Sequence, residues 1–344
     1  MCGHEAGPVL DGGSQALLNR KRVLVPASLG PEGLQLLERR PDLQITRYEP
    51  AIAAAEFHAL LGDAAAVALS WTPFRQPELA AAPRLEVVAR LGVGFDAVAV
   101  PALTGRGVPL MVVGTANSRS VAEHALHLMF ALAKRAAEMD RRVRQGIGHD
   151  RLSGLPGEVS GKTVLIVGFG RIGARTAPRC RAMEMDVLVY DPFVDAGAIR
   201  GAGYEPVADL DAALPRADFV TIHCPKNAET VGLFGAARLA RMRPGAFLVN
   251  TARGGIVDEA ALAAALVSGH LGGAGLDVFD PEPPDPAHPL LQMETVIASP
   301  HMAGVTRESW AAMSATAALN ILGVLDGTPN RGNVVNPEVL RTAE

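Results

Sequence analysis

The chain has 344 residues, which is enough for about two domains of ordinary size. It is 49% hydrophobic and 20% charged, as is typical of a globular protein with a substantial core. The formal net charge of −4 argues against a general affinity for nucleic acid or for an anionic membrane. We therefore expect neither kind of partner.

Three scattered cysteines, Cys2, Cys180 and Cys224, form no CxxC pair and no Cys/His cluster. This pattern predicts no disulfide framework and no metal site, and it fits a cytoplasmic location. The N-terminus lacks the basic start and apolar run of a signal peptide, and we expect it to be a mobile lead-in to the first strand. No apolar run approaches the roughly 20 residues that span a bilayer.

In the first third of the chain, short β-branched runs alternate with segments rich in Ala, Leu and Arg. Pro31 is placed to begin a helix, because proline is tolerated in a first helical turn. Strands separated by helices indicate parallel βα units, and hence a small open α/β sheet. The strands are predicted at residues 23–25, 43–48, 65–69, 85–89 and 110–113.

A long helix is predicted over residues 120–144. Ser118 or Ser120 can cap it, and Glu123 lies three residues after Ser120 in a capping-box pattern. The apolar side chains of this segment recur at helical spacing. We interpret it as a buried helix between two domains, and it could also provide a dimer contact.

After a Gly/Pro-rich loop at 146–157, a second alternating series begins. It ends in a helix at 307–326 and a tail, 329–344, that we expect to pack back on the first domain. The first domain would then be discontinuous, with the second domain inserted into it. The strands of the second series are predicted at 162–167, 187–190, 219–223, 247–250, 273–277 and 296–299.

The first strand of this series runs directly into a GxGxxG motif formed by Gly168, Gly170 and Gly173. The first glycine permits the tight turn, the second lets a pyrophosphate approach the backbone, and the third lets the helix pack closely on the strand. The amides of the helix N-terminus favour phosphate binding. A GxGxxG alone is weak evidence, but here a strand precedes it and a helix pattern follows it, as a dinucleotide site requires.

Asp191 ends the next strand, close to the expected spacing of about 20 residues for an acidic residue that binds the adenosine ribose. A carboxylate there accepts hydrogen bonds from the ribose hydroxyls and repels a 2′-phosphate. Pro192 and Phe193 follow it instead of arginines. The segment favours NAD over NADP, although Asp191 could also be an ordinary turn residue.

Three later strand ends carry Arg253, Glu282 and His301. In an open α/β sheet, ligands bind beyond the carboxyl ends of the strands. The planar fork of Arg253 can pair with a carboxylate, and prolines on both sides restrict the backbone of Glu282. Each residue alone could be structural, but together in one nucleotide-binding domain they indicate a catalytic group.

The sequence resembles the D-isomer-specific 2-hydroxyacid dehydrogenase family, including its phosphoglycerate dehydrogenases and its hydroxypyruvate and glyoxylate reductases. The resemblance covers nearly the whole chain. It runs from Arg90-Leu-Gly-Val-Gly-Phe-Asp96 through Ser120-Val-Ala-Glu123 and the GxGxxG motif to Arg253, Glu282 and His301.

The resemblance implies an α/β fold with two open, doubly wound parallel-sheet domains. An NAD-binding Rossmann domain, residues 116–315, is inserted in a discontinuous flavodoxin-like substrate domain, residues 1–115 and 316–344. The resemblance also implies a homodimer.

The resemblance further implies the activity, which is NAD-dependent interconversion of a small D-2-hydroxy acid and its 2-keto acid. His301 gives a proton to the carbonyl oxygen during reduction and takes it back during oxidation. Glu282 hydrogen-bonds His301 and favours its protonated form. Arg253 orients the substrate carboxylate and polarises the carbonyl, and the protein as a whole aligns substrate and cofactor.

Further contacts follow from the same resemblance. The residues expected at NAD are Gly168, Gly170, Arg171, Ile172, Gly173, Asp191, Cys224, Pro225, Thr230, Thr251, Ala252, Asp277 and Gly304. Those expected at the substrate are Ser70, Arg90, Val93 and Gly94, with Arg253 and His301.

The substrate stays open among 3-phosphoglycerate, hydroxypyruvate and glyoxylate. Arg90 matches a position that phosphoglycerate dehydrogenases use near the substrate phosphate. Their first-domain loop also carries an arginine just before a serine, where this chain has Leu69 before Ser70 and then Trp71. We also expect no regulatory serine-binding domain after residue 344.

Two other functions are compatible with the fold. One is an NAD(H)-sensing binding protein of the corepressor type, which needs a groove for a partner peptide. The other is a phosphite-type dehydrogenase. A formate-type enzyme is disfavoured because such enzymes pair Gln with the histidine, and this chain has Glu282.

Overall fold

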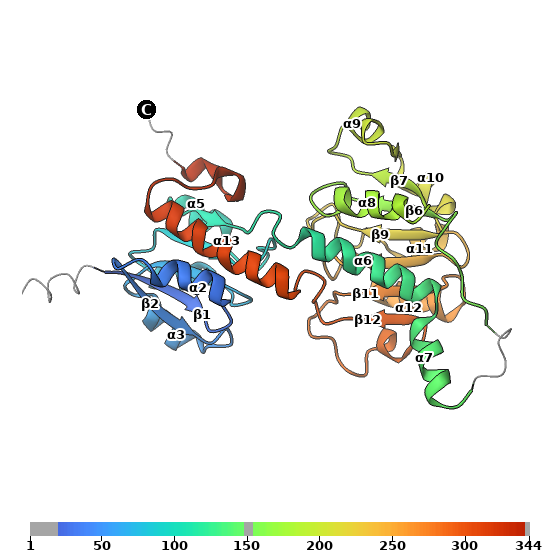
Figure 1. The fold of residues 1–344 in the computed structure, drawn as a ribbon, viewed down its shortest axis with the longest axis horizontal. Helices are drawn as coiled ribbons and strands as arrows, with labels where there is room; N and C mark the ends of the chain where they lie inside the picture. The colour runs from blue at the N-terminus through green and yellow to red at the C-terminus, as the bar shows by residue number, and fades with distance from the viewer. Residues whose placement is uncertain (1–19, 148–153, 341–344) are drawn as a thin grey trace, which may run out of the picture. The chain divides into compact units, whose positions relative to one another are not determined.

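A computed structural model describes residues 20–147 and 154–340 (Figure 1). The N-terminal lead-in and part of the predicted 146–157 loop lie outside the described residues. The chain divides into two compact units: unit 1 is Met1–Asn117 with Arg307–Glu344, and unit 2 is Ser118–Thr306. The division predicted at 315/316 falls inside helix α13 (Arg307–Leu325), all of which belongs to unit 1.

Unit 1 is built on a five-stranded parallel sheet in the order β2-β1-β3-β4-β5. This is the flavodoxin-like order, whose switch point lies between β1 and β3. Alternate side chains face opposite sides, so Val23 and Val25 belong to one core and Leu24 to the other. The strands are β1 (Lys21–Pro26), β2 (Leu43–Tyr48), β3 (Ala64–Leu69), β4 (Val87–Arg90) and β5 (Leu110–Met111).

One face of this sheet is covered by α2 (Pro31–Glu38) and α13, and Pro31 begins α2 as predicted. The two helices pack closely at Gly33, where an added Cβ would lie 2.3 Å from the Ser314 carbonyl oxygen. The tail returns to this unit as expected, since Val334 forms an antiparallel bridge with Met111. The opposite face carries α3 (Ala54–Leu61), α4 (Gln76–Ala81) and α5 (Val100–Gly105). The tail after α13 contains two 3-10 turns, at Arg331–Asn333 and Pro337–Val339.

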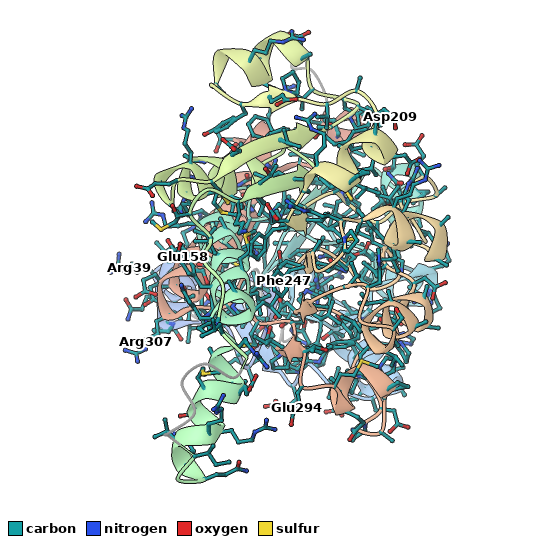
Figure 2. The ribbon with its side chains drawn as sticks, turned by 90° about the vertical axis from the view of Figure 1, so that its right-hand side faces the viewer. Arg39, Glu158, Asp209, Phe247, Glu294 and Arg307 are labelled. Atoms are coloured by element: carbon teal, nitrogen blue, oxygen red, sulfur yellow. The ribbon has the colours of Figure 1, made fainter. Side chains whose placement is uncertain are left out.

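Unit 2 is built on a seven-stranded parallel sheet in the order β12-β11-β10-β9-β6-β7-β8. Counted from β6, this is the Rossmann order 3-2-1-4-5-6 with one more strand, and it reverses between β6 and β9. Phe247, labelled in Figure 2, stacks on Phe219 of the neighbouring strand. The strands are β6 (Thr163–Val167), β7 (Asp186–Tyr190), β8 (Glu205–Pro206), β9 (Phe219–Ile222), β10 (Phe247–Asn250), β11 (Gly273–Leu276) and β12 (Val296–Ala298).

Helices cover both faces of the second sheet, which therefore has a core on each side. Val164 and Ile166 face one core, whereas Leu165 and Val167 face the other. The first face carries α6 (Ser118–Ala133), α8 (Gly173–Ala182) and α9 (Ala196–Gly201); the second carries α10 (Leu210–Ala213), α11 (Ala236–Arg241) and α12 (Glu259–Val267), with 3-10 turns at Leu214–Arg216 and Pro289–Gln292.

The single helix predicted over 120–144 is wrong. Two helices, α6 and α7 (Ala136–Arg144), are separated at Arg135, which has a left-handed φ of 51°. The capping-box prediction also fails, because α6 already begins at Ser118 and the Glu123 carboxylate pairs with Arg179 at 3.4 Å. Helix α7 extends away from the sheet of its own unit (Figure 1).

Among residues 20–147 and 154–340, no helix is long and apolar enough to cross a membrane.

Candidate active site

The glycine-rich turn lies at the carboxyl end of β6, beside the point where the strand order reverses. Gly168 has a φ of +97°, and a Cβ there would lie 2.7 Å from the Cys224 amide nitrogen. A Cβ on Gly173 would lie 2.0 Å from the Gly168 carbonyl oxygen, so this glycine lets α8 pack on the turn. At Gly170, a Cβ would meet no described atom within 4 Å. Open space at this glycine, beside the N-terminus of α8, fits an approaching pyrophosphate.

Asp191 follows β7 directly and is joined to the same turn. Its Oδ2 accepts a hydrogen bond from the Phe169 amide at 2.7 Å, and its Oδ1 accepts one from the Phe193 amide at 2.9 Å. These two bonds orient the carboxylate at the edge of the turn. A carboxylate oxygen can accept more than one hydrogen bond, so Asp191 keeps acceptor capacity for ribose hydroxyls. Arg171 is exposed, and Ile172 occupies the N-cap position of α8 without a side-chain hydrogen bond to the helix.

The carboxyl end of β9 forms the opposite side of the reversal. The Thr230 hydroxyl donates to the Pro225 carbonyl oxygen at 2.6 Å and so closes this loop. Burial, together with the charge of Asp191, raises the pKa of the Cys224 thiol to about 11.

His223 is a residue that the sequence reasoning missed. Its Nε2 lies 3.0 Å from the Thr221 hydroxyl, whereas its buried Nδ1 has no hydrogen-bond partner among the described residues. Burial lowers its pKa to about 3, so the ring is neutral near pH 7. Its position at a strand end, immediately before Cys224 and Pro225, could have indicated from the sequence that it lies near the glycine-rich turn.

The loop after β10 presents Arg253. The buried Asn250 side chain shapes this turn, because it accepts from the Ala252 amide at 3.0 Å and donates to the Arg253 carbonyl at 2.9 Å. The Arg253 guanidinium donates to the Ala252 carbonyl at 2.7 Å. Thr251 has a buried hydroxyl with no partner among the described residues, which is consistent with a polar ligand at this strand end.

The Arg253 turn packs directly on the loop that carries Glu282. A Cβ on Gly254 would lie 1.9 Å from the Phe279 carbonyl oxygen, so no larger residue fits without a shift of the backbone. Glu282 follows Phe279 closely in this loop, and its carboxylate Oε1 accepts a hydrogen bond from the Phe279 amide at 3.0 Å. The strand ends of β10 and β11 thus hold the arginine and the carboxylate in one region.

Glu282 and His301 are hydrogen-bonded, with Glu282 Oε2 2.7 Å from His301 Nδ1. Burial alone raises the pKa of the Glu282 carboxyl. The hydrogen bonds from His301 and Phe279, with the positive charges of His301 and Arg253, outweigh burial and lower it overall. His301 has a left-handed φ of 54°, a strained conformation for a residue other than glycine.

Asp277 lies at the end of β11 with 1% of its surface exposed. It accepts hydrogen bonds from the amides of Met302 and Ala303, each at 2.8 Å. Gly304 is half-buried in the segment that follows. The structure therefore ties Asp277 to the loop of His301, and its contact with the cofactor stays a prediction.

The substrate residues predicted in unit 1 lie at the carboxyl end of its own sheet. The Arg90 guanidinium donates to the Gly94 carbonyl at 2.9 Å and also to the Ser70 carbonyl. Arg90 thereby braces the loops after β3 and β4. Val93 and Gly94 are half-buried, and Trp71 is 63% exposed.

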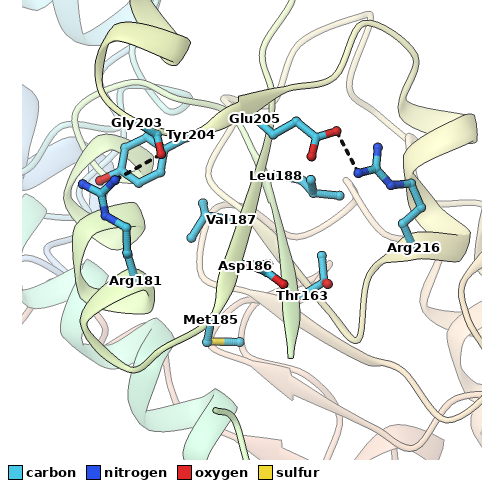
Figure 3. A pocket seen from close by; sticks show the side chains of 10 residues that line it. All are labelled: Thr163, Arg181, Met185, Asp186, Val187, Leu188, Gly203, Tyr204, Glu205 and Arg216. Carbon is cyan, nitrogen blue, oxygen red and sulfur yellow. Dashed lines mark hydrogen bonds and ion pairs between the residues drawn. The ribbon is translucent and has the colours of Figure 1, made fainter. Parts of the chain in front are cut away.

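A surface hollow of about 500 Å³ lies at the opposite edge of the unit 2 sheet, where β6, β7 and β8 begin (Figure 3). Its charged groups are engaged with neighbours, since Arg216 pairs with Glu205 at 2.7 Å and Arg181 donates to the Gly203 carbonyl. None of the predicted site residues lines it. In the described part of the chain, no cluster of three or more His, Cys, Asp or Glu side chains could hold a metal ion.

Unit 2 thus combines a Rossmann sheet, an open glycine-rich cradle at its switch point and an Arg/Glu/His group at neighbouring strand ends. These features define a dinucleotide-binding protein of the dehydrogenase type. Residues 126–303 match the NAD-binding domain of the D-isomer-specific 2-hydroxyacid dehydrogenases. The chain belongs to this family, as the motifs predicted. The two open parallel sheets confirm the predicted fold class.

Relatives of known function cover much of the chain. It is 39% identical over 275 residues to the D-3-phosphoglycerate dehydrogenase of Archaeoglobus fulgidus, which covers 80% of this chain and 52% of the relative. It is 35% identical over 326 residues to the glyoxylate reductase of Korarchaeum cryptofilum. This match covers 94% of this chain and 98% of the relative. The chain spans about half the length of the phosphoglycerate dehydrogenases that it matches.

The fold is also that of a solved relative, the D-lactate dehydrogenase from Aquifex aeolicus in complex with NAD and lactic acid. The TM-score is 0.81 with 26% sequence identity, over 91% of this chain and 99% of that one.

Proposed function

We propose that the protein is an NAD-dependent dehydrogenase that interconverts a small D-2-hydroxy acid and its 2-keto acid. The observation that carries this proposal is the 2.7 Å hydrogen bond between Glu282 Oε2 and His301 Nδ1. A carboxylate can only accept, so Nδ1 carries the proton of this bond. The other ring nitrogen, Nε2, is then the atom that exchanges a proton with a substrate oxygen.

The cradle of unit 2 supports NAD as the cofactor. Open space at Gly170, the amides at the start of α8 and the oriented carboxylate of Asp191 match a pyrophosphate and an unmodified ribose. Among the described residues, the buried hydroxyl of Thr251 and Nδ1 of His223 have no hydrogen-bond partner, so both can bind a polar ligand at the next strand ends. When bound, the cofactor supplies or accepts the hydride.

The side chains of this chain then perform the proton transfer and the orientation. In keto-acid reduction, protonated His301 donates from Nε2 to the carbonyl oxygen, and Glu282 stabilises the positive ring before transfer. In oxidation, neutral His301 removes the hydroxyl proton. Arg253 pairs with the substrate carboxylate and polarises the carbonyl. The lowered pKa of Glu282 keeps its carboxylate charged across the neutral range.

For the substrate, we propose an unphosphorylated keto acid such as glyoxylate or hydroxypyruvate ahead of the 3-phosphoglycerate couple. Two donors of Arg90 bind loop carbonyls. Leu69 stands just before Ser70, where phosphoglycerate dehydrogenases carry a second arginine, and the exposed Trp71 follows Ser70. The names of the relatives include both a phosphoglycerate dehydrogenase and a glyoxylate reductase.

A kinetic screen tests the proposal. The purified protein is assayed with NADH against glyoxylate, hydroxypyruvate, phosphohydroxypyruvate and pyruvate, and with NAD against phosphite. We expect turnover of at least one keto acid, with a higher kcat/KM for an unphosphorylated acid. Oxidation of phosphite without reduction of any keto acid would replace the proposed substrate class. The absence of all turnover would refute the enzyme assignment.

We also propose that the protein acts in the cytoplasm as a homodimer. Helix α7 supports a partner surface, because none of its residues is buried in the described chain and Val143 is 76% exposed. Sedimentation of the wild type and of Val143→Arg should show a dimer that the substitution weakens. A monomeric wild type would remove this proposal.

A further inference from the structure

The loop that carries His301 is anchored on one buried carboxylate. Asp277 accepts from the Met302 amide and the Ser299 hydroxyl through Oδ1, and from the Ala303 amide through Oδ2. The Asp277 carbonyl also accepts from the His301 amide at 2.8 Å. These bonds enclose the one residue of the loop that has left-handed backbone geometry. A strained conformation persists only where its surroundings over-determine it, and these bonds provide that constraint.

The Ser299 hydroxyl has two polar neighbours, and its single proton fixes the direction of both contacts. It donates to Asp277 Oδ1 at 2.6 Å, because a carboxylate cannot donate. The second neighbour is Nε2 of His124, at 2.8 Å. With the hydroxyl proton already used, Nε2 of His124 must carry a proton and donate to the serine oxygen.

A directed chain of hydrogen bonds therefore runs from helix α6 to the catalytic loop. It begins at Nε2–H of His124, passes through the Ser299 hydroxyl and ends on Asp277, all within unit 2. His124 Nε2 also lies 3.8 Å from Asp277 Oδ1. Helix α6 packs directly on β10, β11 and β12, so it is a rigid support for this contact.

We infer that His124 and Ser299 are positioning residues that hold the His301 loop in its reactive geometry through Asp277. The inference rests on the proposed function for its kinetic consequence, whereas the loop contacts themselves do not depend on it. Neither residue touches the substrate in this scheme. Loss of either one would loosen the loop and displace the His301 ring from Glu282.

The protonation of His124 is consistent with this role. Burial lowers its pKa, the charge of Asp277 raises it, and the nearby His127 lowers it, with a net shift downward. Near pH 7 the ring is then neutral with its proton on Nε2. His127 is exposed, and its ring centroid is 5.6 Å from that of His124, so it provides a matched control on the same helix.

The test compares substitutions that remove a hydrogen bond with substitutions that preserve it. Ser299→Ala removes the hydroxyl and Ser299→Thr keeps it. His124→Leu removes the donor, and His124→Gln places an amide N–H at a similar reach. His127→Ala is the control. Each full-length variant is measured for hydrogen–deuterium exchange of the loop amides, for the Kd of NADH, and for kcat and KM with the best keto acid.

We expect Ser299→Ala and His124→Leu to speed exchange at the Met302 and Ala303 amides and to lower kcat roughly ten-fold or more, as small misplacements of a reacting group do. NADH affinity should change little. Ser299→Thr and His124→Gln should restore most of both losses, and His127→Ala should match the wild type.

The two readouts separate this inference from the proposed function. Unchanged exchange in both Ser299→Ala and His124→Leu would overturn the positioning network. Faster exchange with an unchanged kcat would reduce the network to a structural role and also overturn the inference. If the wild type reduces no keto acid, the proposed function fails, and the exchange data still decide whether the network holds the loop.

Discussion

Nδ1 of His301 lies 2.7 Å from Oε2 of Glu282, and the same histidine has a left-handed φ of 54°. The hydrogen bond directs one ring nitrogen to the carboxylate. The His301 side chain is 48% exposed, so the second nitrogen can reach a small acid that enters from solvent.

Removal of the imidazole should abolish most of the turnover. His301→Ala should lower kcat by roughly 10²–10⁴-fold, the usual contribution of a general acid–base group, while NADH still binds. His301→Asn should lose as much activity and fold better, because asparagine tolerates a left-handed φ. Steady-state kinetics with a fluorescence titration of NADH checks both. Unchanged turnover in either variant would remove the assigned role of His301.

The pH dependence of keto-acid reduction should have an acidic limb set by Glu282. Although burial raises the pKa of this carboxyl, the contacts with His301, Phe279 and Arg253 lower it overall. Activity should therefore persist as the pH falls through the ordinary glutamate range, about 4.3, and decline only below it. Because the pKa of Glu282 is lower in the folded protein than in the unfolded chain, its ionisation stabilises the fold at pH values above the unfolded-state pKa. This stabilisation is lost as the pH falls through the folded-state pKa.

Glu282→Gln is the matched variant for this pH profile. Its amide cannot ionise, so the acidic limb should disappear and the maximal rate should drop. Profiles of kcat/KM measured for both proteins over the acidic range decide the point. A wild-type limb at or above the ordinary glutamate range would contradict the prediction.

Much of this arrangement could be predicted from the sequence. Periodicity located every strand except β8 to within about two residues, because buried parallel strands are short apolar runs with distinct ends. The two-residue strand β8 (Glu205–Pro206) was not predicted, since it is only partly buried and carries no apolar run. The strand of residues 43–48 matches β2 throughout. The placement of Arg253, Glu282 and His301 after three successive strands was predicted from the sequence, with the rule that ligands bind at carboxyl ends. The structure adds that these strands, β10, β11 and β12, are neighbours in the sheet.

Other features depend on contacts between distant segments. No glycine or proline lies next to the helix break at Arg135, so the local sequence does not predict it. The left-handed φ of this arginine is imposed by its surroundings. The hydrogen bonds from the loop of His301 to the buried Asp277 carboxylate were not predicted, because the residues that they join lie 25 and 26 positions apart in the chain. The bond between His124 and Ser299 joins residues 175 positions apart and has no local signature.

Asp191 should determine the choice between NAD and NADP. Asp191→Ala should weaken NAD roughly ten-fold or more, because hydrogen bonds to a charged group are worth about 1.5–3 kcal/mol. It should also relax the selection against a 2′-phosphate. Because the carboxylate binds the Phe169 amide, Asp191→Asn is needed as well, since its amide oxygen can keep that contact without the charge.

The control for this prediction is Asp195→Ala, which removes the N-cap of α9 in the same loop. It should leave the ratio of kcat/KM for NAD and NADP unchanged. If neither Asp191 variant moves that ratio, the ribose assignment fails.

One added methyl group should affect cofactor binding at one glycine of the motif and protein stability at another. A Cβ at Gly170 meets no described atom within 4 Å, whereas a Cβ at Gly173 would lie 2.0 Å from the Gly168 carbonyl oxygen. Gly170→Ala should therefore keep the Tm of the wild type and weaken NADH, because the methyl group occupies the space proposed for the pyrophosphate. Gly173→Ala should lower the free energy of unfolding by about 1–3 kcal/mol, as overpacking does.

Thermal unfolding and an NADH titration on both variants separate the two effects. A Gly170→Ala protein that binds NADH like the wild type would mean that the pyrophosphate lies elsewhere, whatever the family match implies. A Gly173→Ala protein of normal stability would mean that α8 can shift away from the turn. The cradle is then held by the Gly168 turn and Asp191, and the rigid contact between helix and strand is not required for it.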